Sequence, residues 1–217
     1  MAERMDWREW HAAYDDPESS LSRRLETVRV ELARVLTARG AHPTQLVSIC
    51  AGDGRDTLPV LAAARADASA VLLELDPTLA AAARSEAERL GLGAVSVREL
   101  DAAAIDSFDG IPRADVFMAC GVFGNVTDAD LVTTVQMLPQ LLARGAIVIW
   151  TRGRPSTDPT GHAGDPAEMV RDVFGRHDFV EERFVRPDDA DFRVGVSRFA
   201  GTPMPPARGQ RMFRFVR

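Results

Sequence analysis

Short apolar runs alternate along the chain with longer stretches of helical periodicity. Five segments have the length and composition of strands, at residues 46–50, 70–75, 95–100, 114–120 and 146–150. Helical patterns fall between them, at 55–66, 77–91 and about 127–143. Strands that alternate with helices in this way predict a mainly parallel sheet covered by helices on both faces.

The two ends of the chain modify this picture. A helix is predicted from about Pro17 to Arg39, because its apolar residues share one face and Gly40 follows it. A short helix starts at Asp165–Pro166, and strand-like segments follow at 179–186, 193–200 and 211–216. Since no long helix separates these last segments, we expect antiparallel pairing there.

The predicted fold class is therefore α/β, a doubly wound mixed sheet of Rossmann-like type, mostly parallel with an antiparallel edge. We expect one domain, because 217 residues suffice for one core. Residues 44–217 would form that core. Residues 1–43 would pack on it as an aromatic segment and a helix, with Trp7, Trp10, His11 and Tyr14 close together.

Composition narrows the function. The net charge of −6 argues against a nucleic-acid partner. No apolar run has the length of a membrane span or the character of a signal peptide. Two cysteines make no disulfide framework, so we expect a reducing, cytoplasmic setting. All 26 basic residues are arginine, which excludes a lysine Schiff base and a P-loop lysine.

A glycine turn and an acid mark a candidate nucleotide site. The first strand runs into Cys50-Ala-Gly-Asp-Gly54, and the second ends at Glu74, about twenty positions later. The carboxyl ends of neighbouring parallel strands meet at one sheet edge, where the sugar of a nucleotide fits between turn and acid. Glu74 has two oxygens to accept from ribose hydroxyls. Asp76 is the competing acid, or the cap of the helix that begins at Pro77.

The turn is unlike one that binds a dinucleotide. It has two glycines, Gly52 and Gly54, where a pyrophosphate loop usually has three. Asp53 and Asp56 would repel a pyrophosphate at the start of the next helix. A cofactor without phosphate and with a cationic amino-acid end fits better, which indicates S-adenosylmethionine.

With these motifs in order, residues 44–217 resemble the class I S-adenosylmethionine-dependent methyltransferases. Cys50–Gly54 looks like their first motif, Leu73-Glu-Leu-Asp-Pro77 like their second, and Leu100-Asp-Ala102 occupies the adenine position. Cys120-Gly-Val-Phe-Gly-Asn125 matches their active-site loop. This loop, Trp10-His-x-x-Tyr-Asp-Asp-Pro17 and Val148-Ile-Trp-Thr-Arg152 are also similar to an actinobacterial group of methyltransferases without an assigned substrate.

The resemblance and the residues together define a predicted cofactor site. Its expected members are Ala51, Gly52, Asp53, Gly54, Glu74, Leu75, Asp101, Ala102, Cys120, Gly121, Tyr14 and Arg24. Asp53 would meet the ammonium group and Asp101 the adenine edge, unless Asp101 only caps a short helix. Leu75 would cover the adenine face, although an apolar residue there also suits a core. The N-terminal aromatic segment is either a flap over the site or a segment pinned to the sheet.

The acceptor side is less defined by sequence. We expect Val122, Phe123, Asn125 and Arg152 to contact substrate, although Asn125 also suits a turn. His11 and His162 are the candidate bases, needed only if the acceptor arrives protonated. No metal is expected, because the fifth strand runs into the cationic segment Thr151–Arg154.

The sequence thus predicts an enzyme that transfers a methyl group to a small molecule by in-line displacement, mainly through positioning. The chain has little length beyond its core for binding a macromolecule. A nicotinamide-dependent oxidoreductase is the alternative, weakened by the missing third glycine and the impossible Tyr-x-x-x-Lys pair. A non-catalytic cofactor-binding or scaffold protein of the same fold is the other. The sequence does not predict an oligomeric state.

Overall fold

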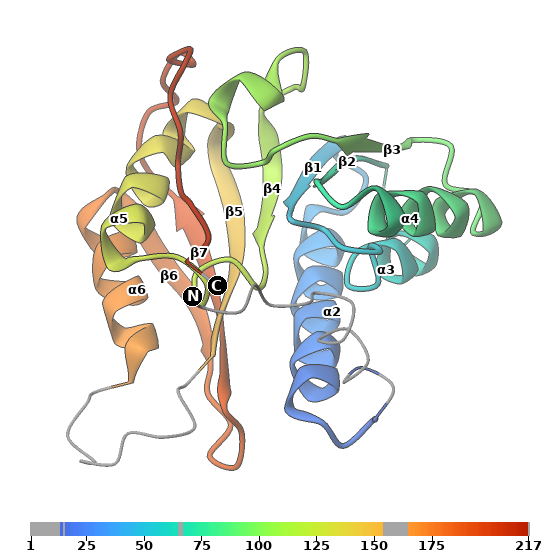
Figure 1. Cartoon of the computed structure of the whole chain (residues 1–217), viewed down its shortest axis with the longest axis horizontal. Helices are drawn as coiled ribbons and strands as arrows, with labels where there is room; N and C mark the ends of the chain where they lie inside the picture. Colours follow the sequence, from blue (N-terminus) through green and yellow to red (C-terminus); the bar gives the residue numbers. More distant parts are fainter. Residues whose placement is uncertain (1–13, 15, 65–66, 154–164, 217) are drawn as a thin grey trace.

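The computed structural model of the chain describes residues 14, 16–64, 67–153 and 165–216. Within these residues, one seven-stranded sheet has the order β3-β2-β1-β4-β5-β7-β6 (Figure 1). Its strands are β1 (Thr44–Ile49), β2 (Ala68–Glu74), β3 (Val95–Glu99), β4 (Ala114–Ala119), β5 (Leu142–Gly153), β6 (Phe179–Val185) and β7 (Phe192–Phe199). The first five are parallel, and β7 is antiparallel to both of its neighbours. The predicted mixed, doubly wound sheet is confirmed.

Helices cover both faces of the sheet. One face carries α2 (Ser20–Arg39), α3 (Leu58–Ala63) and α4 (Pro77–Arg89); the other carries the 3-10 turn η2 (Ile105–Phe108), α5 (Asp128–Met137) and α6 (Pro166–Arg176). Successive side chains of the buried strands alternate between two apolar clusters. In β4, Phe117 belongs to the α5 side and Met118 to the α2 side. Helix α2 packs against β5 and β7.

The C-terminal segment differs from the prediction. Residues 211–216 were expected to be a strand beside the antiparallel edge, and that prediction is wrong. They make isolated bridges only, between Arg211 and Ala104 and between Phe215 and Val126. Because those partners lie in the loops after β3 and β4, the segment runs along the carboxyl edge of the sheet instead of extending it.

Two helices are shorter than their apolar patterns suggest. The helix expected over 55–66 spans only Leu58–Ala63, since residues before it continue the glycine turn, with Leu58 N donating to Gly54 O. The helix expected to reach residue 143 ends at Met137. Pro139 lies in the 3-10 turn η3 (Leu138–Gln140), and β5 begins directly afterwards at Leu142.

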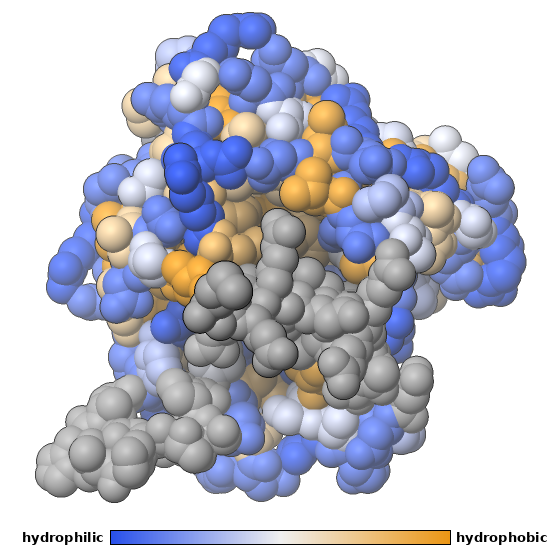
Figure 2. Space-filling view, viewed as in Figure 1, coloured by the Kyte–Doolittle hydropathy of each residue, from blue (hydrophilic) through white to orange (hydrophobic). Residues whose placement is uncertain are grey.

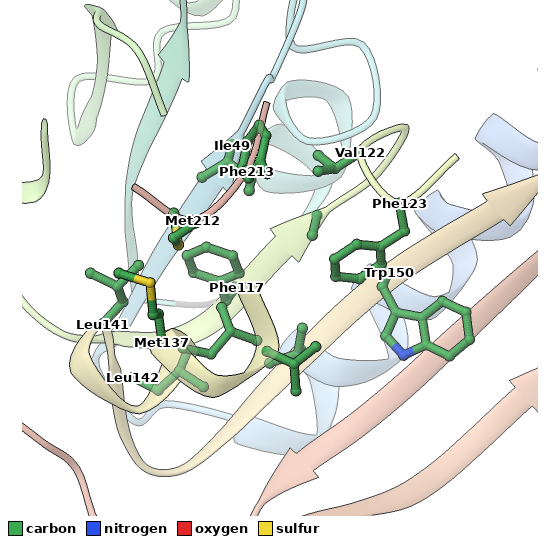
Figure 3. Packing of buried hydrophobic residues seen from close by; sticks show 14 of the residues in the cluster. Ile49, Phe117, Val122, Phe123, Met137, Leu141, Leu142, Trp150, Met212 and Phe213 are labelled. Atoms are coloured by element: carbon green, nitrogen blue, oxygen red, sulfur yellow. The ribbon is translucent and has the colours of Figure 1, made fainter. Parts of the chain in front are cut away.

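Aromatic side chains fill the core beneath the functional edge. Phe117 lies near Met212, and Phe123 faces Trp150 edge-on with their ring centroids 6.4 Å apart (Figure 3). The Trp150 indole lies over Gly195, its pairing partner on β7. A Cβ at Gly195 would come within 2.1 Å of an indole carbon. Glycine is therefore required where the Trp150 ring crosses β7.

This contact predicts a large stability loss for Gly195→Ala. Overpacking of a close-packed core typically costs about 1–3 kcal/mol, and here the ring has no room to retreat. Urea unfolding should show the loss as a lower midpoint. Gly175→Ala is the matched control, because helical Gly175 has no atom within 4 Å of an added Cβ and alanine has the higher helix propensity, so this variant should not lose stability. Equal midpoints for the two variants would contradict the packing.

Candidate functional site

The turn that follows β1 has a backbone that favours glycine. Cys50, Gly52 and Gly54 have φ values of 51°, 58° and 74°. A Cβ on Gly54 would lie 2.7 Å from Leu58 Cδ1 and 3.0 Å from Leu72 Cδ2. Gly54 therefore lets the turn pack closely on α3 and β2. Cys50 is a non-glycine residue in the left-handed region, which costs about 1 kcal/mol at the carboxyl end of β1.

Glu74 joins this turn to the end of β2. Its carboxylate accepts hydrogen bonds at 2.8 Å from the backbone N–H groups of Gly52 and Asp76, one on each oxygen. The side chain is only 9% exposed. Since a carboxylate has about four acceptor positions, each Glu74 oxygen keeps capacity for a further donor. The acid is fixed beside the glycine turn and still able to accept from a ligand.

Asp76 and Leu75 complete the end of β2. Asp76 caps α4, since its carboxylate accepts from Thr78 N and Leu79 N, as the sequence alternative proposed. Leu75 lines the pocket with 63% of its surface exposed, so it is not a core residue. An apolar side chain this open at a cavity wall is suited to cover the flat face of a ligand.

Two acids lie in the turn itself. Asp53 forms a two-oxygen ion pair with Arg55, two positions along the chain. Asp56 lines the pocket and accepts a hydrogen bond from the Thr57 hydroxyl. Burial raises the pKa of the Asp56 carboxyl, and the neighbouring charge of Asp53 adds to the increase. A carboxyl held in an unfavourable environment at a pocket wall is typical of a functional site. Asp56 was not among the predicted site residues.

Tyr14 enters the pocket from the N-terminal side. Its hydroxyl accepts a hydrogen bond from Arg24 Nη2 at 2.9 Å, and the Arg55 guanidinium lies 4.5 Å from its ring centroid. Burial raises the pKa of the Tyr14 phenol, although Arg24 opposes the shift. Arg24 lines the pocket, whereas the preceding residue, Arg23, pairs with Asp189.

Asp101 and Ala102 lie at the end of β3, on the same edge. The Asp101 carboxylate accepts from Ala103 N at 3.0 Å and from Arg211 Nη2 at 2.6 Å. Ala102 is buried and lines the pocket. The turn at Asp101 is therefore held from both sides, by its own backbone and by the C-terminal segment.

Cys120 and Gly121 form the wall at the end of β4. Gly121 has φ 80°, and its N–H donates to the Thr151 hydroxyl at 2.8 Å. Burial raises the pKa of the Cys50 thiol, and the carboxylates of Glu74 and Asp101 raise it further. The pKa of Cys120 is raised by burial and by Asp56. Both shifts favour the neutral thiol over the thiolate.

These residues line one cavity of about 710 Å³, a volume typical of small-molecule sites. Apolar surface gathers around the middle of this face in Figure 2. Three of the exposed large apolar side chains, Leu75, Leu100 and Phe215, lie in the cavity lining. The lining includes residues that sequence reasoning missed: Leu25, Val28, Arg55, Asp56, Leu100, Arg211, Phe213, Arg214 and Phe215. The available clue was the concentration of arginine and phenylalanine in Arg211-Met-Phe-Arg-Phe215.

The four residues expected to contact substrate are not among the residues that line this cavity. Val122 and Phe123 have no exposed surface and pack in the core, so neither side chain faces the cavity. Asn125 donates its side-chain amide to Gly121 O at 2.7 Å, which stabilises the loop after β4. Arg152 lies outside the lining, 4.0 Å from Asp128. The candidate bases His11 and His162 lie outside the described residues.

The described residues contain neither a metal-binding cluster nor a membrane-spanning helix. No group of three or more His, Cys, Asp or Glu side chains there is arranged to hold a metal ion. None of the helices within the same ranges combines the length and apolarity needed to cross a bilayer.

The environment of Asp56 predicts a pH-dependent effect of Asp56→Asn. The pKa of the Asp56 carboxyl is higher in the folded protein than in the unfolded chain, where it is about 4. The folded protein therefore loses stability as the pH rises from about 4 through the folded pKa. The amide variant does not titrate and can still accept from Thr57. Its melting temperature should therefore exceed that of the parent by a margin that grows as the pH rises above about 4 and levels off once the pH has passed the folded pKa of Asp56. Asp188→Asn, at an exposed site, controls for the loss of one negative charge. A constant difference across pH would contradict the burial of this acid.

No family model and no curated protein sequence match the chain. Solved structures do. Magnesium protoporphyrin IX methyltransferase (ChlM) from Synechocystis, with bound SAH, has a TM-score of 0.66 at 16% identity, over 88% of this chain and 93% of that one. The N-methyltransferase NodS from Bradyrhizobium japonicum has a TM-score of 0.60 at 17% identity, covering 81% and 96%. The pyocyanin biosynthetic protein PhzM has a TM-score of 0.60 at 20% identity and matches 82% of this chain, which spans 56% of PhzM. The chain therefore has the Rossmann-like fold that these three proteins share.

Proposed function

We propose that the protein is an S-adenosylmethionine-dependent methyltransferase acting on a small molecule. The observation that carries the proposal is the Glu74 carboxylate, bonded to Gly52 N at the wall of the 710 Å³ cavity. This is an acid at the end of β2, fixed against a glycine turn at the end of β1. Two neighbours of the same fold were solved with S-adenosylmethionine or its demethylated product.

The cavity residues fit this cofactor. Glu74 accepts from the two ribose hydroxyls, and the exposed side chain of Leu75 covers the adenine face. Ala102 and the turn at Asp101 border the adenine edge. The carboxyl groups of Asp53 and Asp56 accept hydrogen bonds from the ammonium group, and Arg24 pairs with the cofactor's carboxylate. Ala51, Gly52, Gly54 and Gly121 bring the backbone close, and Tyr14 closes the N-terminal side, as a flap would.

The residues act mainly by positioning. The bound cofactor supplies an already activated methyl group, so the protein has to hold an acceptor in line with it and exclude water. Cys120 and Gly121 border that place at the end of β4. A base is needed only for an acceptor that arrives protonated. His11 and His162 keep that proposed role.

The wider setting belongs to the same proposal. We place the protein in a reducing, cytoplasmic compartment because Cys50 and Cys120 are both free thiols. We group it with the actinobacterial methyltransferases whose segments it resembles. We assign it neither a nucleic-acid nor a membrane partner. The alternatives are a nicotinamide-dependent oxidoreductase and a scaffold that binds the cofactor without transfer.

Calorimetric titration distinguishes the cofactors. S-adenosylmethionine and S-adenosylhomocysteine should bind, and NAD should not. Glu74→Gln should weaken S-adenosylhomocysteine binding roughly 10–100-fold, because an amide cannot accept at both oxygen positions. Glu99→Gln is the matched control. Glu99 lies opposite Glu74 in the register of the neighbouring strand β3, but it is exposed and outside the cavity lining. NAD binding without S-adenosylhomocysteine binding would support the oxidoreductase.

Enzyme and scaffold are separated by turnover. Wild-type protein incubated with S-adenosylmethionine labelled in its methyl group and a small-metabolite extract should transfer label to an acceptor. Gly54→Val should abolish that transfer, because a side chain there would meet Leu58 and Leu72 and displace the turn. Tight cofactor binding without label transfer from any extract would favour the scaffold.

A further inference from the structure

The C-terminal segment Arg211–Phe215 lies along the same sheet edge as the cofactor residues. Its first residue bridges to Ala104, after β3, and its last bridges to Val126, after β4. The sheet order β3-β2-β1-β4 therefore places the segment parallel to the edge that holds Asp101, Glu74 and the glycine turn. Hydrogen bonds from Met212 N to Ala103 O and from Val216 N to Asn125 O hold it at both ends.

Because the segment runs from the loop after β3 to the loop after β4, its two ends border different parts of the cavity. Assigning those parts to cofactor and acceptor rests on the proposed function. With adenine at Asp101 and ribose at Glu74, the transferable methyl group lies toward β4. Arg211, paired with Asp101, then borders the adenine side. Residues 213–215 border the side from which an acceptor approaches, next to Cys120 and Gly121.

The chemistry of this far end is aromatic. Phe213 is almost fully buried and lies beside Ile49 in the core (Figure 3). It is also one of the residues that line the cavity. Phe215 is 40% exposed at the rim. The two ring centroids are 5.4 Å apart and the planes are tilted by 47°. Two such rings at the wall and rim of a pocket suit stacking or edge-on contact with a flat ring.

The charge at this end is positive. The other charged groups of the cavity have partners, which are Asp53 with Arg55, Asp101 with Arg211, Glu74 with two backbone amides, Asp76 with the start of α4, Arg24 with the Tyr14 hydroxyl and Asp56 with the Thr57 hydroxyl. The guanidinium of Arg214 makes no hydrogen bond or ion pair with any described residue. Only its backbone N–H is engaged, by Asp130 at 3.2 Å. Arg214 is exposed and lines the cavity between the two phenylalanines.

We propose that Phe213, Arg214 and Phe215 form the acceptor site, and that the acceptor is a flat aromatic molecule with an anionic group such as a carboxylate. The rings contact the aromatic part. The planar guanidinium of Arg214 donates two parallel hydrogen bonds to the anion. Arg214 and Phe215 thus determine specificity, and the cofactor residues do not.

The test uses full-length protein saturated with S-adenosylhomocysteine and ligand-observed NMR titration of three probes. Naphthoate should bind about tenfold more tightly than neutral naphthamide, because a charge-assisted hydrogen bond contributes about 1.4 kcal/mol, which corresponds to a tenfold change in affinity. It should also bind more tightly than cyclohexanecarboxylate, which has the anion without the aromatic ring. Arg214→Gln should remove the preference for naphthoate over naphthamide. Phe215→Leu should weaken both aromatic probes alike.

The controls separate this inference from the proposed function. Arg208→Gln removes another exposed arginine, one that pairs with Asp109 outside the cavity lining, and should change nothing. Arg214→Gln should leave S-adenosylhomocysteine affinity unaltered. Equal binding of naphthoate and naphthamide to the wild type, or a preference that survives Arg214→Gln, overturns the acceptor site while cofactor binding stands. Failure of S-adenosylhomocysteine to bind the wild type overturns the proposed function itself.

Discussion

The contact between the Glu74 carboxylate and Gly52 N organises the functional edge of this protein. Glu74 is the last residue of β2, and Gly52 lies in the turn after β1, so the contact ties together the ends of two adjacent parallel strands. The left-handed conformation of Gly52 turns its N–H toward the acid, and the close fit of Gly54 against Leu58 and Leu72 holds the turn down. A carboxylate nearly enclosed by protein needs such donors, because burying an unpaired charge is costly.

The rest of the cavity is assembled around this link from parts of the chain that are far apart in sequence. The ends of β3 and β4 supply Asp101 and Gly121, α2 supplies Arg24, and the C-terminal segment closes the remaining side. The backbone of that segment forms hydrogen bonds to two separate loops, one after β3 and one after β4. Such bridging fixes the width of the cavity, since both loops are attached to one short piece of chain.

Sequence reasoning predicted the part of the site that depends on local order. The spacing of Gly52, Gly54 and Glu74 follows from the βαβ unit, and the cap at Asp76 is a property of the four residues around it. The acceptor side was not predictable in the same way. Val122 and Phe123 follow a strand directly, but the direction of each side chain depends on how the loop packs on Trp150 and α6. Residues 211–216 have the alternation of a strand, yet their partners are more than eighty positions away. Asp56 depends on a burial that composition does not reveal.

The two raised thiol pKa values have a consequence for the safety of the proposed chemistry. A sulfonium methyl donor is an alkylating agent, and cysteine thiolate is the strongest nucleophile among protein side chains. Cys50 and Cys120 both lie in the cavity wall, close to where such a donor would be held. Burial and the surrounding carboxylates favour the neutral form of both thiols, and the neutral thiol reacts far more slowly. With the proposed cofactor bound, the same negative environment would therefore disfavour methylation of the two cysteines by that cofactor.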